Sequence, residues 1–237
     1  LAEEHHYDFP VTLPFRPKGV HSSFPGSPLS KGQFQFDLWG VNPSNRYPWD
    51  DLRRKVQHYG VRNSLLISLM PTASTSQILG NNETIEPFTS NLYVRRVLSG
   101  EFVCVNKHLV HKLSKLNLWT AELRNLLVQN RGSIQNIPNI PNDIKKLFRT
   151  VWEIPQKNLI DLAADRAPFI CQSQSLNLFL SKPTYSKVSA MHFYAFRKGL
   201  KTGIYYLRTK PATNPIQFSV SVEDNKKRKI ECLSCGS

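Results

Sequence analysis

The sequence is short of several features that would place it in particular classes of protein. Only four of its 237 residues are cysteine, too few for a disulfide-stapled scaffold, which indicates a reducing, cytoplasmic compartment. No apolar run approaches the roughly 18 residues that a membrane-spanning helix needs. The first residues do not resemble a secretory signal either. We therefore expect neither a membrane protein nor a secreted disulfide-rich one.

Acidic residues are also scarce, since 17 Asp and Glu stand against 31 Lys and Arg, for a net charge of +14. This surplus favours an anionic partner, such as a nucleic acid, an acidic protein segment or a phosphorylated small molecule. The basic residues are nevertheless dispersed, apart from residues 226–229, and the aromatics form no RNA-binding motif. A solvated basic surface is the simpler interpretation, so we do not expect nucleic-acid binding.

The cysteines divide into two kinds. Cys104 and Cys171 lie in or after apolar stretches, and we expect them to be buried small hydrophobes. Cys232 and Cys235 form one C-x-x-C pair near the end of the sequence. A single such pair, without a second pair or nearby histidines, is a poor zinc site. We therefore interpret it as a mobile dithiol and expect no metal site.

Enough apolar sequence is present for a packed core, since 40% of the residues are hydrophobic and 11% are aromatic. Hydrophobic periodicity predicts helices that alternate with strands, which is typical of an α/β fold. Helical spacing occurs at residues 49–59, 107–116, 119–130, 144–152, 155–164 and 187–198. Strand patterns occur at 65–70, 92–105 with a break at Ser99-Gly100, 172–180 and 202–207.

We expect the chain to be organised around residues 63–91. The apolar run Leu65–Met70 predicts a buried strand that Pro71 ends. Three hydroxyls then surround the start of a short helical pattern: Thr72, Ser74 and Thr75. A strand that leads into a helix start offers free N–H groups and a positive dipole end to an anion. A plain hydroxyl cap, worth about 1 kcal/mol, explains the same residues, and local chemistry alone favours it.

Five motifs resemble the C-terminal part of the large subunit of class I ribonucleotide reductase in its eukaryotic form. They occur in the family's order: LLISLMPTASTSQILGNNETIEPFTSN, VRRVLSGEF, FICQSQSLNLF, MHFYAFRKGLKTGIYYLRTKPATNPIQF and the terminal ECLSCGS. The resemblance covers roughly residues 24–237. It implies the C-terminal half of the ten-stranded α/β barrel that this family uses.

The resemblance also implies three parts and an activity. Residues 1–23 are an irregular Pro-rich segment, of which 10–23 look inserted; residues 24–221 belong to the barrel domain, and 222–237 are a flexible redox tail. The implied activity reduces ribonucleoside diphosphates to deoxyribonucleoside diphosphates by radical chemistry. The chain begins with Leu, and the family's catalytic cysteines lie upstream of its start, so we expect this stretch alone to be inactive. The alternative is a truncated, non-catalytic protein that binds the small subunit.

Two sets of site residues follow from the resemblance. The segment that holds the substrate's diphosphate corresponds to Pro71, Thr72, Ala73, Ser74 and Thr75. Tyr205 and Tyr206 correspond to a stacked pair that passes a radical from the small subunit toward an active-site cysteine. Adjacent residues of a regular strand point to opposite faces, so stacking requires an irregular backbone. We expect Gly199 and Gly203 to permit it.

The third set is Cys232 and Cys235, which correspond to the tail dithiol that re-reduces the active-site disulfide by thiol exchange. The resemblance implies no cofactor in this chain, because a metal-containing small subunit supplies the radical. The implied partners are that small subunit, a nucleoside diphosphate, thioredoxin or glutaredoxin as reductant, and a second large subunit when complete. The chain departs from the family's pattern where Cys171 replaces an acidic residue and Ala195 replaces glycine.

Overall fold

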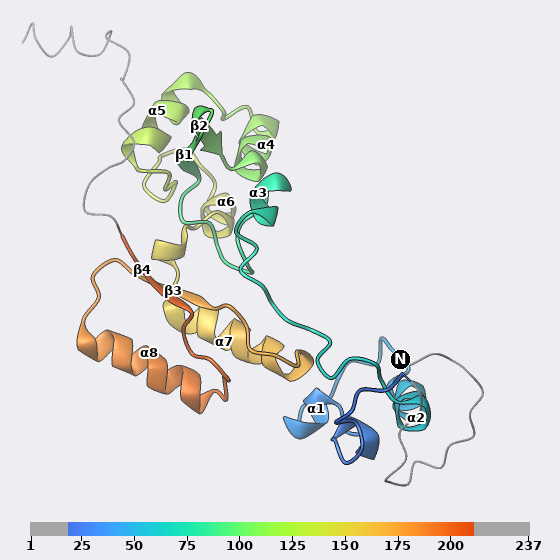
Figure 1. Cartoon of the computed structure of the whole chain (residues 1–237). Coiled ribbons are helices and arrows are strands. Elements are labelled where there is room, and N and C mark those ends of the chain that lie inside the picture. The colour runs from blue at the N-terminus through green and yellow to red at the C-terminus, as the bar shows by residue number, and fades with distance from the viewer. Residues whose placement is uncertain (1–18, 211–237) are drawn as a thin grey trace, which may run out of the picture. The chain divides into compact units, whose positions relative to one another are not determined.

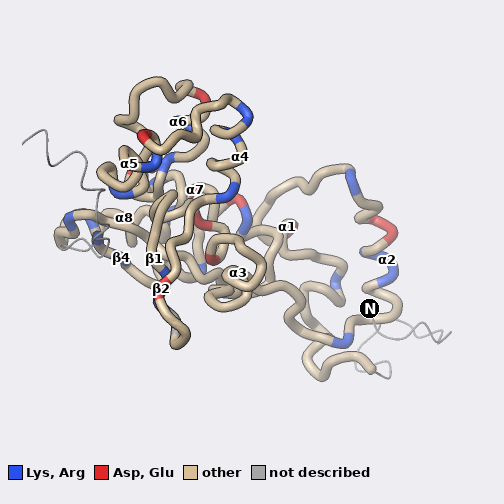
Figure 2. Tube along the Cα trace, turned by 90° about the horizontal axis from the view of Figure 1, so that it is seen from above, with Lys and Arg blue, Asp and Glu red and all other residues tan. Residues whose placement is uncertain are grey.

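The computed structural model describes residues 19–210, which divide into two compact units (Figure 1). Of the described residues, unit 1 takes 19–84, 156–178 and 183–207, and unit 2 takes 85–155, 179–182 and 208–210. Lys and Arg residues are spread along both units (Figure 2). Within the described range, no helix is long and apolar enough to cross a membrane.

Unit 1 begins with the 3₁₀ turn η1 (Leu29–Lys31) and the helices α1 (Gln35–Leu38) and α2 (Trp49–Tyr59). The predicted helix at 49–59 is confirmed. It ends because Gly60 takes a φ of 72° and a ψ of −170°, a conformation that essentially only glycine adopts. The buried core beneath these helices consists of Val20, Phe24, Val56 and Val61.

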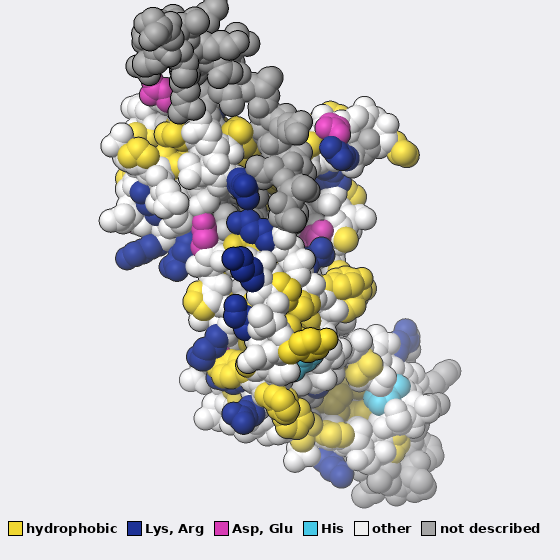
Figure 3. Space-filling view, turned by 90° about the vertical axis from the view of Figure 1, so that its left-hand side faces the viewer, with side chains coloured by type: hydrophobic (Ala, Val, Ile, Leu, Met, Phe, Trp, Pro, Cys, Tyr) yellow, Lys and Arg dark blue, Asp and Glu magenta, His cyan; other side chains and the backbone are white. Residues whose placement is uncertain are grey.

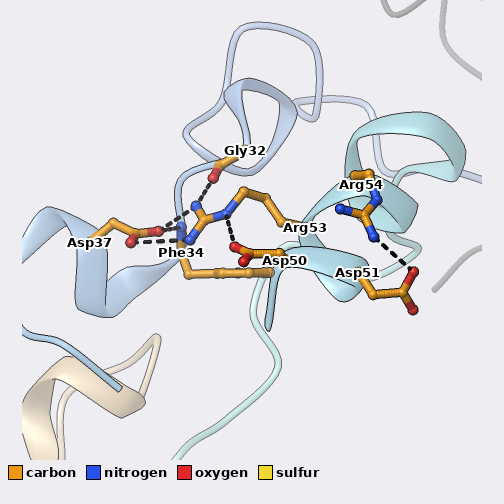
Figure 4. A network of polar contacts seen from close by, with 7 residues as sticks. All are labelled: Gly32, Phe34, Asp37, Asp50, Asp51, Arg53 and Arg54. Carbon is orange, nitrogen blue, oxygen red and sulfur yellow. Dashed lines mark hydrogen bonds and ion pairs between the residues drawn. The ribbon is translucent and has the colours of Figure 1, made fainter. Parts of the chain in front are cut away.

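Arg53 ties α2 to α1 (Figure 4). Its guanidinium donates to the two Asp37 carboxylate oxygens at 2.7 and 3.3 Å and also to the carbonyl of Gly32. The carboxylate in turn accepts from the backbone N–H of Phe34 at 2.7 Å, and the guanidinium lies over the Phe34 ring, 5.1 Å from its centre. The Arg53 hydrogen bond holds the pKa of Asp37 below its ordinary value.

The Asp37–Arg53 pair predicts a loss of stability in acid. A carboxylate whose pKa is lowered by folding stabilises the fold above its unfolded pKa, and the contribution disappears as pH falls through the folded pKa. Both side chains are only about a third exposed, at 31% and 28%, so the pair is worth about 1 kcal/mol. We expect Asp37→Asn to lower the melting temperature at pH 7 and to lower it by less at pH 3. Equal losses at both pH values would contradict this assignment.

The predicted buried strand at Leu65–Met70 is wrong as a strand and as a buried element. Its residues are extended, but only Leu69 forms a β-bridge, parallel to Gln174. Leu65, Leu66 and Met70 are more than half exposed. Parallel strands are buried when other strands and helices cover them. Of the described residues, only those at 171–175 bond to this segment's backbone, so the rest of it stays open to solvent.

The second part of unit 1 contains the helices α7 (Gln156–Arg166) and α8 (Tyr185–Arg197), which lie side by side, and the 3₁₀ turn η3 (Ala167–Phe169). Asp161 of α7 accepts from the Tyr194 hydroxyl at 2.6 Å and from the Lys198 amine at 2.9 Å. Lys157 approaches the same carboxylate at 3.0 Å. These bonds, that of Tyr194 first, hold the pKa of Asp161 well below its ordinary value.

Unit 2 is built around an antiparallel hairpin, β1 (Leu92–Val97) and β2 (Gly100–Val105), followed by α4 (Lys107–Lys115), α5 (Ala121–Gln129), α6 (Asn142–Leu147) and the 3₁₀ turn η2 (Val151–Glu153). The predicted break at Ser99-Gly100 and the helices predicted at 107–116 and 119–130 are confirmed. The helix predicted at 144–152 ends at Leu147, and residues 151–153 form η2 instead. Asn106 and Thr120 cap α4 and α5, because their side chains accept from the first-turn N–H groups. The core contains Leu109, Leu113, Leu127, Ile134 and Ile137.

The α/β character is confirmed, but the described residues form no closed barrel. They contain two two-stranded sheets, β1 with β2 and β3 (Asn177–Leu180) with β4 (Tyr206–Thr209). The predicted strand at 172–180 is regular only from Asn177, and the one at 202–207 begins at Tyr206 and runs two residues further. The isolated bridge between Leu69 and Gln174 is parallel, as the pairing in a barrel of this kind is. The predicted domain boundaries stay predictions.

Candidate functional site

The 71–75 loop turns the chain from the extended segment at 65–70 into α3 (Thr75–Ile78). The turn is made at Thr72, whose φ of 54° lies in the left-handed region. Helical bonding starts when Ser76 N–H donates to the Thr72 carbonyl at 2.9 Å. Among residues 19–210, no acceptor is found for the backbone N–H groups of Ala73, Ser74 and Thr75. The loop therefore presents a row of unused donors.

The hydroxyls of this loop do not cap α3, so the simpler interpretation from local chemistry is wrong. Ser74 occupies the N-cap position but makes no capping bond, because its φ of −88° and ψ of −42° are already helical. The Thr75 hydroxyl donates weakly to the Thr72 carbonyl, at 3.5 Å. The side chains of Thr72–Thr75 are exposed, whereas Ser76 is buried. The Ser74 and Thr75 hydroxyls thus remain accessible to a ligand.

Residues 81–84 hold the 71–75 loop in place through hydrogen bonds. The backbone N–H of Thr84 donates to the Thr72 hydroxyl oxygen at 2.9 Å. Thr84 is itself left-handed, with a φ of 50°, and Asn81 N–H donates to the Ser76 carbonyl at 2.7 Å. Left-handed threonines are costly and persist where the surroundings hold them. The loop is therefore held in one shape by bonds that span 12 residues of sequence.

The rings of Tyr205 and Tyr206 are in contact, in a tilted arrangement, although the two residues are adjacent in sequence. Their ring centres lie 4.3 Å apart at an interplanar angle of 56°. Tyr205 lies just before β4, and its N–H donates to the Leu176 carbonyl at 2.7 Å, so the strand alternation does not apply to the pair. A hydrogen bond with Tyr206 raises the pKa of Tyr205 above its ordinary value. The rings are 47% and 52% exposed.

The two glycines upstream contribute in different ways. Gly199 ends α8 in the left-handed region, with a φ of 78°, as predicted. Gly203 is not left-handed, so the prediction that it supplies conformational freedom there is wrong. Its role is close approach, because a Cβ at this position would lie 3.3 Å from the Cβ of buried Ala195. Gly203 therefore lets the chain that carries the tyrosine pair lie directly on α8.

The predicted cysteines fall in three places. Cys104 and Cys171 are free and only partly buried, so the prediction of buried hydrophobes is wrong. The Cys171 sulfur is a hydrogen-bond acceptor: it accepts from the backbone N–H groups of Leu66 and Ile67 at 3.1 and 3.2 Å. Sequence reasoning missed this, although an acidic residue expected at that position was a signal for a hydrogen-bond acceptor. Cys232 and Cys235 lie outside the described residues.

Residues 171–176, which we term the middle segment, lie between two parts of the site. On one side, Gln172 N–H donates to the Ile67 carbonyl at 3.3 Å and Ser175 N–H to the Leu69 carbonyl at 3.2 Å. On the other side, the Leu176 carbonyl accepts from Tyr205. The segment that leads into the 71–75 loop and the residue that begins the tyrosine pair thus share one neighbour.

The outer face of α8 is apolar and open. Its exposed large side chains include Tyr185, Phe193 and Phe196. Hydrophobic side chains are also visible beside Lys and Arg on the face drawn in Figure 3. Among the residues that the structure describes, no three His, Cys, Asp or Glu side chains are grouped so that they could hold a metal ion.

Comparison with known proteins identifies the family. The ribonucleotide reductase barrel domain model matches residues 16–206. The large subunit of ribonucleoside-diphosphate reductase from Caenorhabditis elegans is 60% identical over 202 residues, which cover 85% of this chain and 26% of that protein. The zebrafish (Danio rerio) large subunit is 54% identical over 244 residues, covering 92% of this chain and 31% of that protein. The chain thus spans about a quarter to a third of these relatives.

A solved structure supports the same relationship. The class Id ribonucleotide reductase alpha subunit of Actinobacillus ureae superimposes with a TM-score of 0.57 at 32% sequence identity. The superposition covers 68% of this chain and 31% of that one. Sequence and fold therefore agree, and the chain belongs to the family of ribonucleotide reductase large subunits.

Proposed function

We propose that this chain serves the large subunit of a ribonucleoside-diphosphate reductase by supplying a substrate phosphate-binding loop, a tyrosine radical relay and a tail dithiol. The observation that carries the proposal is the ring contact of Tyr205 with Tyr206, whose centres lie 4.3 Å apart where Tyr205 precedes the start of β4. Ordinary strand packing would separate these rings. The contact between the two rings suits the transfer of a radical from one tyrosine to the other.

The proposed phosphate site is the loop of Pro71, Thr72, Ala73, Ser74 and Thr75. A diphosphate requires several short donors that converge on its oxygens, and bonds to a charged acceptor are the strong ones. The free N–H groups of residues 73–75 and the accessible hydroxyls of Ser74 and Thr75 meet that requirement. The left-handed turn at Thr72 exposes them together.

The proposed relay moves one hydrogen-atom equivalent per step. An oxidised tyrosine regains its proton and its electron from the adjacent phenol, which becomes the new radical. The ring contact between Tyr205 and Tyr206 gives the electron a path, and the two adjacent phenols are the donor and the acceptor of the proton. The radical originates in a metal-containing small subunit and ends on an active-site cysteine expected upstream of this sequence.

The overall reaction oxidises two active-site thiols, and the proposed role of the tail is to reduce them again. When the ribose C–OH of the substrate becomes C–H, the oxygen leaves as water and two thiols of the active site become a disulfide. Cys232 and Cys235 reduce this disulfide by exchange and become a disulfide themselves. Thioredoxin or glutaredoxin then supplies the two electrons that restore them. We propose that a second large subunit completes the enzyme in the cytoplasm.

Reductant dependence tests this assignment. In a complete large subunit that carries residues 24–237 of this chain, we expect Cys232→Ser or Cys235→Ser to give one burst of product with thioredoxin. A small dithiol should restore multiple turnovers, because it reaches the active-site disulfide without the tail. Cys104→Ser is the matched control and should behave as the unmodified subunit does. Failure of the small dithiol to rescue the tail variants would contradict the role of the tail.

A further inference from the structure

We infer that Gln174 is a positioning residue, which anchors the middle segment to α7 and so sets the placement of Tyr205 relative to the extended segment at 65–70. This inference rests on the proposed function, because it concerns how the phosphate-binding loop and the tyrosine relay are held together. Gln174 itself belongs to neither. It lies among residues of unit 1 only, as do all its contacts named below.

The side chain of Gln174 is buried, at 7% exposed, and both ends of its amide are used. Its Nε2 donates to the Ala163 carbonyl at 2.7 Å, and its Oε1 accepts from Arg166 Nε at 3.3 Å. Ala163 and Arg166 lie in the last turn of α7. Gln174 therefore binds the end of α7 from outside the helix.

The two bonds require a side chain that both donates and accepts, as the Gln174 amide does. Glutamate lacks the donor that Ala163 requires, and leucine lacks both donor and acceptor. Arg166 is partly buried, and burial lowers its pKa, so the loss of an acceptor would leave a cation poorly solvated. The bonds to Ala163 and Arg166 of α7 thus determine which residue type suits position 174.

The backbone around Gln174 transmits this anchorage in two directions. Gln174 forms a β-bridge with Leu69 of the extended segment at 65–70, and Ser175 N–H donates to the Leu69 carbonyl. Two residues beyond Gln174, the Leu176 carbonyl accepts from Tyr205 N–H at 2.7 Å. A shift of the middle segment would therefore move Tyr205 with it. Misplacement of reacting groups by about 1 Å can cost on the order of a hundredfold in rate.

The conformation of the 71–75 loop depends less on the bonds between Gln174 and α7. Its donors, at residues 73–75, are held by the bond between Thr84 and Thr72 and by the start of α3, all of which are local to residues 72–84. Loss of the Gln174 anchor should thus disturb radical transfer more than substrate binding. This separation distinguishes a positioning role from general destabilisation, which would weaken both.

The test uses a complete large subunit carrying this sequence, its small subunit and a small dithiol as reductant. For Gln174→Leu we expect kcat to fall by about tenfold or more while KM for the nucleoside diphosphate changes less than about twofold. Gln174→Glu keeps the acceptor for Arg166, so its kcat should lie between those of Gln174→Leu and the unmodified subunit. This variant should fold even if the leucine variant does not. Gln172→Leu, in the same segment but exposed, is the matched control and should keep both constants.

Four results would overturn the inference. Unchanged kcat in both Gln174 variants would show that the anchor does not matter for the relay. A rise of KM in proportion to the loss of kcat, or equal losses in Gln172→Leu, would indicate a general defect of the segment. An inactive unmodified subunit would remove the proposed function and this inference with it, which separates the two failures.

Discussion

Tyr205→Phe or Tyr206→Phe is expected to reduce turnover of the complete enzyme by at least about a thousandfold, or roughly 4 kcal/mol of activation free energy. Phenylalanine keeps the ring and its contact but has no O–H, so it cannot give up a proton and an electron together. Because the relay is serial, either substitution alone breaks it. The loss should be the same with thioredoxin and with a small dithiol, since reductants act after the radical step.

The same substitutions should leave the fold intact. Both rings are about half exposed, and a change that conserves volume usually costs less than about 1.5 kcal/mol. Tyr185→Phe is a suitable control, because this tyrosine lies on α8 and is 96% exposed. Melting temperature and turnover should be measured on the same samples. Substantial activity in either relay variant, or rescue by a dithiol, would refute the assignment.

Elements with strong local signals could be predicted from the sequence. The helix at 49–59 has apolar residues at turn spacing and a glycine at its end, and α2 has these bounds. The hairpin follows from β-branched residues on either side of Ser99-Gly100. Such patterns depend on neighbours a few residues away, so they do not require knowledge of the tertiary structure.

Other features depend on contacts distant in sequence and could not be predicted in this way. The apolar run at 65–70 has the composition of a buried strand, but its burial depends on which segments lie beside it. Thr72 accepts from Thr84, and Gln174 is bonded to α7, so neither role is visible in a local pattern. Gly203 illustrates the same point, since glycine was expected for its dihedral freedom but is required by the Cβ of Ala195.

The tyrosine pair lies between these cases. The resemblance to the reductase family predicted the stack at Tyr205 and Tyr206, whereas strand periodicity argued against it. The structure resolves the conflict through the start of β4, which excludes Tyr205 from the regular alternation. A local rule failed at a proposed functional position, as expected where function requires an unusual backbone.

Substrate affinity, finally, should depend on the hydroxyls of the 71–75 loop. In the complete subunit, each hydroxyl-to-phosphate bond lost through Ser74→Ala or Thr75→Ala should cost about 1.5–3 kcal/mol, or roughly 10- to 150-fold in Kd. Ser74 should matter at least as much as Thr75, because its hydroxyl makes no capping bond, whereas that of Thr75 is weakly bonded to the Thr72 carbonyl. Neither change should lower the melting temperature appreciably.

Two controls separate phosphate binding from the shape of the loop. Ser68→Ala removes an exposed hydroxyl from the extended segment before the loop and should leave substrate Kd unchanged. Thr72→Val removes the acceptor for Thr84 N–H, so it should weaken binding and lower stability together. Binding of allosteric effectors, whose site is expected upstream of this sequence, should be unaffected in all four variants. If Ser74→Ala and Thr75→Ala both bound the nucleoside diphosphate with unchanged Kd, the diphosphate would have to be held by backbone N–H groups alone or at another site.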